Sequence, residues 1–242
     1  MNQTNFRDEL RFLSKIGVDT RFLSCYNENI HINNQRFSRF TKKRQELFLK
    51  NYSEYNIHSS KIFQKICTRA SRVLARSLKP REKIFIENDG VCPAFLLEIL
   101  LEPYKRKYGI EILRGHCGDV NPEEFNSIAM PTTLDDEAVF VLNRIFNGEK
   151  IDVFHLKNNL NFENQKKLIY PLQNVPISWI ELWIKKLGYE CEFTAEINVE
   201  KETLNFIEQF IPNVRENILK SALFISENSI NKNEINKKIE II

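Results

Sequence analysis

Two neighbouring carboxylates, Asp135 and Asp136, open the helix that the sequence predicts over residues 134–146. A strand predicted over residues 127–130 would deliver them to the carboxyl edge of a sheet, where open α/β folds bind their ligands. Paired carboxylates at such an edge can hold a magnesium ion or contact a substrate base. A structural role explains them equally well, because Thr133 is a good N-cap and acids in a first turn oppose the helix dipole.

Residues 87–93 form the other turn that could meet a ligand, because they follow a short β-rich run and precede a predicted helix. A phosphate-binding turn needs several glycines, a hydroxyl and often a lysine, so that backbone N–H groups can approach the anion. This turn has Gly90 as its one glycine, carries Glu87 and Asp89 beside it, and loses a backbone donor at Pro93. Its composition therefore indicates a structural connection.

Thiol chemistry is limited by the spacing of the cysteines. The five cysteines, an odd number, include no two within four positions of each other: Cys25, Cys67, Cys92, Cys117 and Cys191. Because there is no CxxC pair, the spacing argues against a zinc ribbon or a disulfide framework. We therefore expect reduced thiols, with Cys191 a structural thiol.

Charge is unevenly distributed along the chain. The net charge is +3, but residues 36–81 contain 13 lysines and arginines against two glutamates, a local charge of +11 that leaves −8 on the remainder. A basic face concentrates polyanions and steers them toward itself. A nucleic acid is the polyanion that we expect this segment to bind. The residues expected to contact its phosphates are Lys42, Lys43, Arg44, Arg69, Arg72, Arg76, Lys79 and Arg81. The alternative for this segment is a pair of solvated helices.

The elements that must position these groups change period along the chain. Residues 1–35 show no clear period, whereas residues 37–52 and 59–78 have the three- and four-residue spacing of helices. Strands are expected at residues 83–87, 110–113, 127–130 and 167–172, and helices at 93–107, 134–146, 178–186, 200–210 and 214–226. Strand, turn, helix and strand within about 30 residues form a βαβ unit, which implies a parallel sheet.

The chain is expected to divide into three segments. These are a basic helical segment over residues 1–80, an α/β unit over residues 81–226 and a polar tail over residues 227–242. No stretch approaches the roughly 18 apolar residues that a membrane span requires, and the polar start lacks the apolar core of a signal peptide. We therefore expect a cytoplasmic protein without a membrane partner.

Three strings resemble a known family of enzymes. TLDDEAVFVLNRIFNGEKID is similar to a motif of the PP-loop ATPases that modify tRNA, particularly the TtuA and cytosolic tRNA 2-thiolation families and their relative TilS. RASRVLARSLKPREKIFIENDGVCPAFLLEILL resembles the family's basic helix, first strand, SGGxDS phosphate loop and Leu-rich helix, and IYPLQNVPISWIELWIKKLGYECEF resembles its later strand, helix and ECPY-type turn. The resemblance covers roughly residues 60–225. It implies a Rossmann-like PP-loop fold (adenine nucleotide alpha hydrolase-like), with helices on both faces of a parallel sheet.

The chain departs from this family at the residues that would hold ATP. Asn88 and Asp89 replace the first serine and glycine of the phosphate loop, Cys92 and Pro93 replace its last aspartate and serine, and Gly90 remains. The resemblance therefore implies a degenerate nucleotide-binding loop at Asn88, Asp89 and Gly90 that has lost its contacts with pyrophosphate.

The family's sulfur chemistry is also incomplete. In the TtuA-like branch, three cysteines serve sulfur transfer or an iron–sulfur cluster. Cys191 matches the last of them, and Cys117 lies in the right interval without a partner two residues away. Because a cluster needs more thiolates than this, we expect neither a metal nor a cofactor. The alternative cofactor is Mg-ATP.

A retained fold with a decayed phosphate loop is typical of the noncatalytic subunit of the eukaryotic and archaeal type tRNA thiolase. The resemblance thus implies a tRNA-binding or scaffolding protein that acts in wobble-uridine 2-thiolation, as a hetero-oligomer with a catalytic PP-loop paralogue. One rival is an active ATP-dependent tRNA-modifying enzyme that uses Asp135 and Asp136 for the metal and Cys117 and Cys191 for sulfur. Another is an α/β interaction protein without an RNA role.

Overall fold

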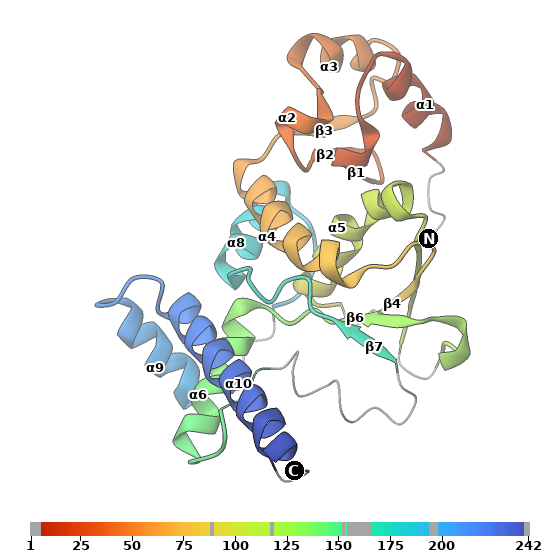
Figure 1. Cartoon of the computed structure of the whole chain (residues 1–242). Coiled ribbons are helices and arrows are strands. Elements are labelled where there is room, and N and C mark those ends of the chain that lie inside the picture. Colours follow the sequence, from red (N-terminus) through yellow and green to blue (C-terminus); the bar gives the residue numbers. More distant parts are fainter. Residues whose placement is uncertain are drawn as a thin grey trace.

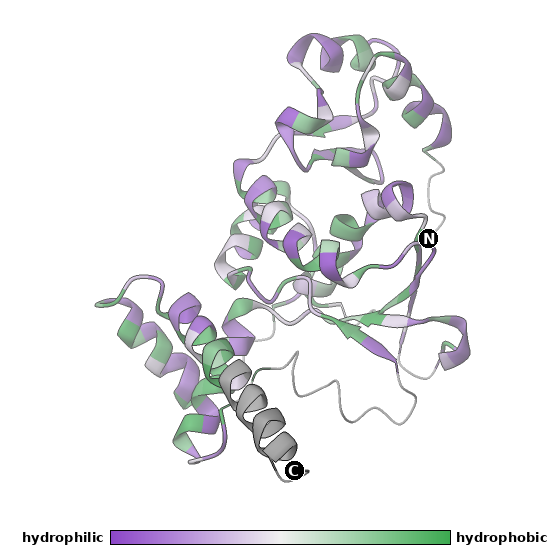
Figure 2. Cartoon of the chain, viewed as in Figure 1, coloured by the Kyte–Doolittle hydropathy of each residue, from purple (hydrophilic) through white to green (hydrophobic). Residues whose placement is uncertain are grey.

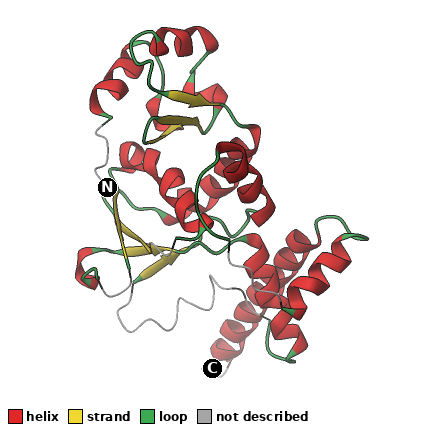
Figure 3. Cartoon of the chain, turned by 180° about the vertical axis from the view of Figure 1, so that it is seen from behind, coloured by secondary structure: helices red, strands yellow, loops and turns green. Residues whose placement is uncertain are grey.

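The structure is a computed structural model that describes residues 6–87, 90–116, 119–151, 153, 166–193 and 198–239, with side chains described up to residue 226. Two small sheets and a group of C-terminal helices follow one another along the chain (Figure 1). Helices α4 (Lys61–Ser77), α5 (Cys92–Tyr108) and α8 (Ile177–Leu187) lie between the two sheets, as the front and back views both show (Figures 1 and 3).

Residues 6–58 form an N-terminal unit with its own sheet and core. Its elements are α1 (Arg7–Lys15), the 3-10 turn η1 (Thr20–Phe22), β1 (Leu23–Tyr26), β2 (Asn29–Ile32), α2 (Gln35–Ser38), α3 (Lys42–Leu49) and β3 (Asn56–His58). Strands β1 and β2 form an antiparallel hairpin, and β3 pairs with β2 in parallel. Buried apolar side chains from the helices and strands, among them Leu13, Ile30, Phe40 and Phe48, fill the core.

This unit differs from the basic helical segment that the sequence predicts over residues 1–80. Its strands are at most four residues long, and β1 and β2 each bury three consecutive residues, so the period-2 pattern of a half-exposed strand is absent. Asn27, with φ of 49°, turns the hairpin within residues 1–35, where the sequence shows no clear period. Arg39, with φ of 54°, divides the helix predicted over residues 37–52 into α2 and α3.

The α/β unit has the predicted parallel sheet. Its strands are β4 (Lys83–Glu87), β5 (Glu111–Gly115), β6 (Ser127–Ala129) and β7 (Lys167–Ile169), with the 3-10 turn η2 (Pro122–Glu124) before β6. They lie in the order β5-β4-β6-β7, and every neighbouring pair is parallel. The α/β class and the parallel sheet flanked by helices are therefore confirmed.

One face of this sheet carries the main core. Ile84 and Ile86 of β4 join buried side chains of α4, α5 and α8, including the fully buried Trp183 and the stacked Phe63. In Figure 2, hydrophobic residues, coloured green, lie along the strands of this sheet. Phe85 points to the opposite face, where its ring stacks on Phe125 at 5.0 Å between centroids. In the part of the chain that the structure describes, α4, α5 and α8 cover the face of Ile84 and Ile86.

The remaining helices, α6 (Leu134–Phe146), α9 (Val199–Glu208) and α10 (Val214–Ile239), form a group beside the sheet (Figure 1). Leu134 and Val141 of α6 pack against Leu219 and Ala222 of α10. Helix α10 continues to Ile239, so much of the segment predicted as a tail has helical backbone. None of the helices in the described ranges combines the length and hydropathy needed to cross a bilayer.

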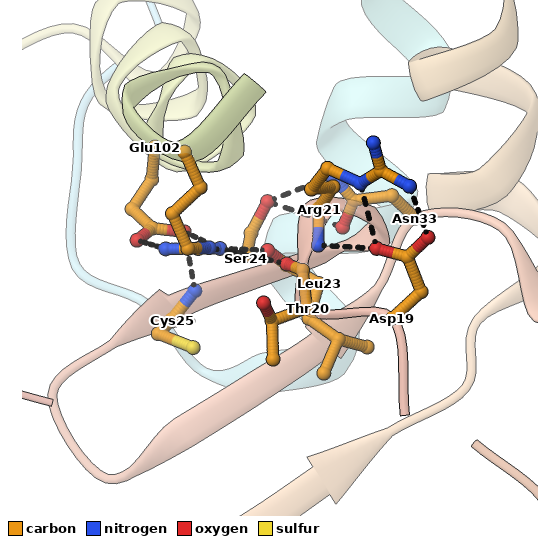
Figure 4. Close-up of polar contacts among 9 residues, drawn as sticks. Asp19, Thr20, Arg21, Leu23, Ser24, Cys25, Asn33 and Glu102 are labelled. Carbon is orange, nitrogen blue, oxygen red and sulfur yellow. Dashed lines mark hydrogen bonds and ion pairs between the residues drawn. The ribbon is translucent and has the colours of Figure 1, made fainter. Parts of the chain in front are cut away.

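Arg106 and Glu102, one turn apart on α5, attach the N-terminal unit to the α/β unit. Figure 4 shows the Glu102 side chain beside the backbone nitrogen of Cys25. The Arg106 guanidinium donates hydrogen bonds to the carbonyls of Thr20, at 3.2 and 3.0 Å, and of Leu23, at 2.6 Å. The Glu102 carboxylate pairs with Arg106 and accepts the backbone N–H of Cys25 at 3.0 Å. One ion pair therefore satisfies backbone groups of η1 and β1 together.

Candidate functional site

A cavity of about 860 Å³ lies beside the carboxyl ends of β4 and β6. The chain passes from β4 to β5 on one side and then returns to β6 on the other, so these ends form the switch point at which open α/β sheets bind ligands. Residues after both strands line the cavity, together with residues of α4, α8, α9 and α10. Its lining includes the side chains of Arg69, Pro93, Asp135, Asp136, Trp179 and Arg215.

The turn after β4 is hydrogen-bonded to a neighbouring segment of the same chain. The Cys92 N–H donates to the Glu192 carbonyl at 2.8 Å, and the Glu192 N–H donates to the Gly90 carbonyl at 3.1 Å. A parallel bridge between Val91 and Glu192 completes this pairing. Because Pro93 has no N–H, the Cys92 pairing uses a donor that a phosphate would need at the start of α5. Of the predicted loop residues, Gly90 adopts φ of 79°, while Asn88 and Asp89 lie outside the described residues.

A disulfide links the same two segments. Cys92 and Cys191 form it with Cα atoms 5.1 Å apart, although they are 99 residues apart in sequence. The expectation of reduced thiols is therefore wrong for this pair, and Cys191 is bonded where the sequence predicted a structural thiol. No local motif could have revealed the pair, because its two halves meet only after β4 and α8 are packed. Cys25 and Cys67 are free, and Cys117 lies outside the described residues.

Asp135 is bonded to protein groups through both carboxylate oxygens. One oxygen lies 2.8 Å from the Arg215 guanidinium, and the other accepts the backbone N–H of Ile177 at 2.7 Å. Burial raises the pKa of the Asp135 carboxyl above its usual range, while the Ile177 hydrogen bond and the Arg215 charge act in the opposite direction. The side chain thus joins α6 to α8 and α10.

Asp136 caps its own helix. Its carboxylate accepts the backbone N–H and the hydroxyl of Thr133, both at 2.7 Å, and the Asp136 N–H donates to the Thr133 hydroxyl oxygen at 3.4 Å. This reciprocal pair is a capping box, which confirms the N-cap interpretation of Thr133. The two carboxylates therefore line the cavity side by side, and each has protein donors.

Arg215 is a site residue that the sequence analysis did not identify. Its side chain is 10% exposed and faces Asp135, Glu208 and Asn205, which come from α6 and α9. The guanidinium supplies positive charge beside the carboxylate that a metal ion would otherwise neutralise. In the sequence, Arg215 is simply an arginine one residue after the predicted start of a helix. Arginines at such positions are common on exposed surfaces, so nothing in the local sequence indicates that this one is buried.

Arg69 turns inward from α4 to the same cavity. It donates to the Asn174 carbonyl at 2.7 Å, lies 3.3 Å from the Glu216 carboxylate and stacks over the Trp179 ring at 4.3 Å from its centroid. Of the predicted RNA contacts, Arg69 is thus engaged in the wall of the cavity rather than presented on the basic face.

The other predicted RNA contacts fall into two groups. Arg72 and Arg76 are exposed on α4, and Lys79 and Arg81 are exposed in the turn that follows. The second group lies on α3, where Lys42 and Lys43 are exposed and Arg44 is half-buried, with a 2.7 Å hydrogen bond to the Arg39 carbonyl. Helices α3 and α4 lie on opposite sides of the N-terminal sheet (Figures 1 and 3).

The described residues do not fit the cofactors of the family that the sequence resembles. A cluster needs several thiolates, but Cys191 and Cys92 are joined to each other, and the described part of the chain contains no group of three metal-binding side chains. Mg-ATP needs free backbone donors and free carboxylates, whereas Cys92, Asp135 and Asp136 are all bonded within the chain.

Comparisons with known proteins agree with this fold. No model of a known protein family matches the chain. A probable sulfurtransferase of Methanocaldococcus jannaschii is 28% identical over 94 residues, a match that covers 38% of this chain and 28% of that protein, so the chain matches less than a third of the relative's length. A solved structure of the U34-tRNA thiolase NcsA from Methanococcus maripaludis with its [4Fe-4S] cluster superposes with a TM-score of 0.54 at 16% identity, covering 73% of this chain and 84% of that one. The chain therefore has the fold of that thiolase structure.

Proposed function

We propose that this chain is a noncatalytic PP-loop protein that binds tRNA and acts as a scaffold in wobble-uridine 2-thiolation. The fold similarity to a U34-tRNA thiolase and the partial match to a probable sulfurtransferase support the thiolation context. In this proposal a catalytic PP-loop paralogue supplies adenylation and sulfur, and the two chains form a hetero-oligomer.

The observation that carries the noncatalytic role is the pairing of the turn after β4 with residues 190–193. In this pairing, the Cys92 N–H donates to the Glu192 carbonyl and the Cys92 sulfur is bonded to Cys191. Pro93, the next residue, has no N–H to donate. A nucleotide would have to displace two backbone hydrogen bonds and the Glu192 segment to reach the start of α5. Each such exchange removes protein hydrogen bonds that binding would have to replace.

The size of the cavity favours one rival. At about 860 Å³ it is within the range of small-molecule sites, so an active ATP-dependent tRNA-modifying enzyme remains the second candidate. That enzyme would need Asp135 to leave Arg215 in order to bind a metal. Nucleotide binding therefore separates the two functions, and RNA binding separates both from an α/β interaction protein without an RNA role.

Direct binding of tRNA tests the proposal. The full chain is titrated with unmodified tRNA over a series of salt concentrations by filter binding. We expect log affinity to fall linearly with log salt, with a slope of about −0.7 to −0.9 for each phosphate that the protein neutralises. Copurification from the native host identifies the partner. If the chain binds no tRNA, either alone or with the copurified partner, the proposed function is wrong.

A further inference from the structure

We propose that the Cys92–Cys191 pair is a thiol-exchange site whose substrate is a small thiol that carries an amino group. The external sulfur attacks Sγ of Cys191 and becomes attached there, and Cys92 is released. This inference goes beyond the proposed function and does not depend on RNA binding.

The two sulfur atoms differ in access. Cys92 is completely buried under the first turn of α5, whereas Cys191 is partly exposed. A small cavity of about 140 Å³ adjoins Cys191, and its lining includes Cys191 and not Cys92. Thiol–disulfide exchange depends on which sulfur the attacking thiolate can reach. The geometry therefore points to attack at Cys191.

The position of Cys92 suits the leaving group. Cys92 is the first residue of α5, and the N-terminus of a helix stabilises an anionic thiolate. Exchange is faster when the departing thiol forms a stable thiolate. Attack at Cys191 thus produces the anion at the end of α5 that favours negative charge.

The lining of the small cavity sets the charge of the substrate. It contains Glu87, Glu98 and Glu190 against one cation, Arg114, which pairs with Glu98. Its formal charge is negative, so it attracts an ammonium group and repels a carboxylate. Two unit charges about 8 Å apart in water interact by about 0.5 kcal/mol, which changes a rate about twofold. An aminothiol is therefore favoured over an acidic thiol.

The exchange balances over two steps. In the first, the external thiol loses its proton, a bond forms between its sulfur and Cys191 Sγ, and the Cys92–Cys191 bond breaks. Cys92 Sγ takes the electron pair and then the proton that the external thiol released. In the second, another external thiolate attacks the attached sulfur and releases the Cys191 thiolate. Two external thiols are oxidised to one disulfide, and the protein disulfide is reduced to two thiols.

Reduction of the disulfide would leave the turn after β4 joined to the segment around Glu192 by the Val91–Glu192 bridge and its hydrogen bonds. Val91 and Pro93 on one segment and Phe193 on the other line the large cavity. The oxidation state of this pair therefore controls how firmly one wall of that cavity is held.

Mapping of the adduct tests the site. The full chain, purified without reductant, is treated briefly with cysteamine and quenched with acid. Free thiols are then alkylated, and peptides are identified by mass spectrometry. We expect cysteamine on Cys191 and the alkyl group on Cys92. The Cys92→Ser chain should accumulate the cystamine adduct on Cys191, and the Cys191→Ser chain should carry none on Cys92. Cys67→Ser, which retains the pair, should behave like the wild type.

Charge selectivity supplies a second readout. Reduction rates are compared for cysteamine and 3-mercaptopropionate at equal thiolate concentration. Glu190→Gln should reduce their ratio about fourfold, because the lost charge changes each rate about twofold and in opposite directions. Glu54→Gln, an exposed change in the N-terminal unit, is the matched control and should leave the ratio unchanged. The proposal is wrong if Cys92 carries the adduct, if both cysteines are already alkylated before reduction, or if Glu190→Gln leaves the ratio unaltered. The mapping uses the wild-type chain, so it does not depend on the folding of any variant.

Discussion

Asp135 and Arg215 form an ion pair whose side chains are 16% and 10% exposed. Burying two charges costs desolvation free energy that their attraction offsets only while both partners are present. Arg215 also neutralises Glu208 on α9, so its guanidinium is shared by two carboxylates. At the scale of the residue, the carboxylate that sequence analysis offered as a metal ligand is part of a three-helix ion-pair network.

Removing the cation should therefore be costly. Arg215→Ala leaves Asp135 buried without its counter-charge, and we expect it to lower the free energy of unfolding by about 3–5 kcal/mol, measured by urea denaturation. Arg11→Ala removes a comparable pair with Asp8 whose side chains are 67% and 82% exposed, and should cost less than about 1 kcal/mol. Equal losses in the two variants would contradict the buried network.

His31 should make stability depend on pH. It is completely buried, its ring stacks on His58 at 4.9 Å, and its Nε2 lies 2.9 Å from the Tyr189 hydroxyl. Burial lowers the pKa of His31 to about 3, and the neighbouring His58 acts in the same direction. As the pH falls, His31 therefore takes up a proton in the unfolded chain at a higher pH than it does in the folded chain. The contribution of His31 is fully present above about pH 6.5 and is lost as the pH falls toward 3, at up to about 1.4 kcal/mol per pH unit.

The slope of this pH dependence is the measurement. We expect the free energy of unfolding to fall less steeply in His31→Phe than in the wild type between about pH 6.5 and pH 4. His116→Asn, at an exposed position, should retain the wild-type slope. A wild-type slope in His31→Phe would show that His31 is not the group responsible.

At the scale of the element, α5 both anchors the N-terminal unit and presents the start of the candidate site. Arg106→Leu would leave three carbonyl contacts and the Glu102 carboxylate without their cation. Because hydrogen bonds to charged groups contribute about 1.5–3 kcal/mol each, we expect residues 6–58 to exchange their amide hydrogens faster, while the α/β unit retains its protection.

Hydrogen exchange followed by mass spectrometry checks this, with Arg76→Leu on the exposed face of α4 as the control. Uniform acceleration throughout the chain would argue that Arg106 supports overall stability rather than the attachment of one unit.

The elements differ in how well the sequence predicted them. Long helices with a clear apolar period, such as the one predicted over residues 59–78, agree with α4 to within two residues at each end, and β4 agrees completely. The hairpin β1–β2 could not be found, because its strands are short and bury consecutive residues. A short strand depends on its partner for stability more than on its own pattern.

The candidate site divides in the same way. Thr133 and Asp136 are within one helical turn, so the capping box could be predicted from local sequence. The Arg215–Asp135 ion pair joins residues 80 positions apart, and the Cys92–Cys191 disulfide joins residues 99 positions apart. A single sequence does not show which residues so far apart are in contact. Long-range pairing therefore changed the interpretation of this site, and its place at the carboxyl ends of β4 and β6 stays a prediction.

At the scale of the whole molecule, the charge asymmetry is the basis of the proposed RNA binding. With Arg69 inside the cavity wall, α4 retains Arg72 and Arg76 on its exposed face. We expect the double reversal Arg72→Glu and Arg76→Glu to weaken tRNA binding and to reduce the salt slope by about 0.7–0.9 for each lost phosphate contact. Because both residues are exposed, the free energy of unfolding should change by less than about 0.5 kcal/mol.

The matched control for this prediction is Lys185→Glu with Lys186→Glu, an equal change of charge at exposed residues of α8 outside the basic segment. It should alter the salt slope less than the α4 reversal does. If the two variants lose affinity equally, net charge rather than the α4 surface determines binding.

Mg-ATP titration tests the central claim most directly, namely that the turn after β4 and the carboxylates of α6 are occupied by the protein itself. Isothermal titration is performed on the full chain with and without reductant, so that opening of the Cys92–Cys191 disulfide is included. The structure predicts no saturable binding at sub-millimolar nucleotide in either state, because Pro93 lacks a donor and Asp135 stays paired with Arg215. A saturable curve that Asp135→Ala abolishes in a folded chain would contradict the proposed noncatalytic role and favour the active enzyme in its place.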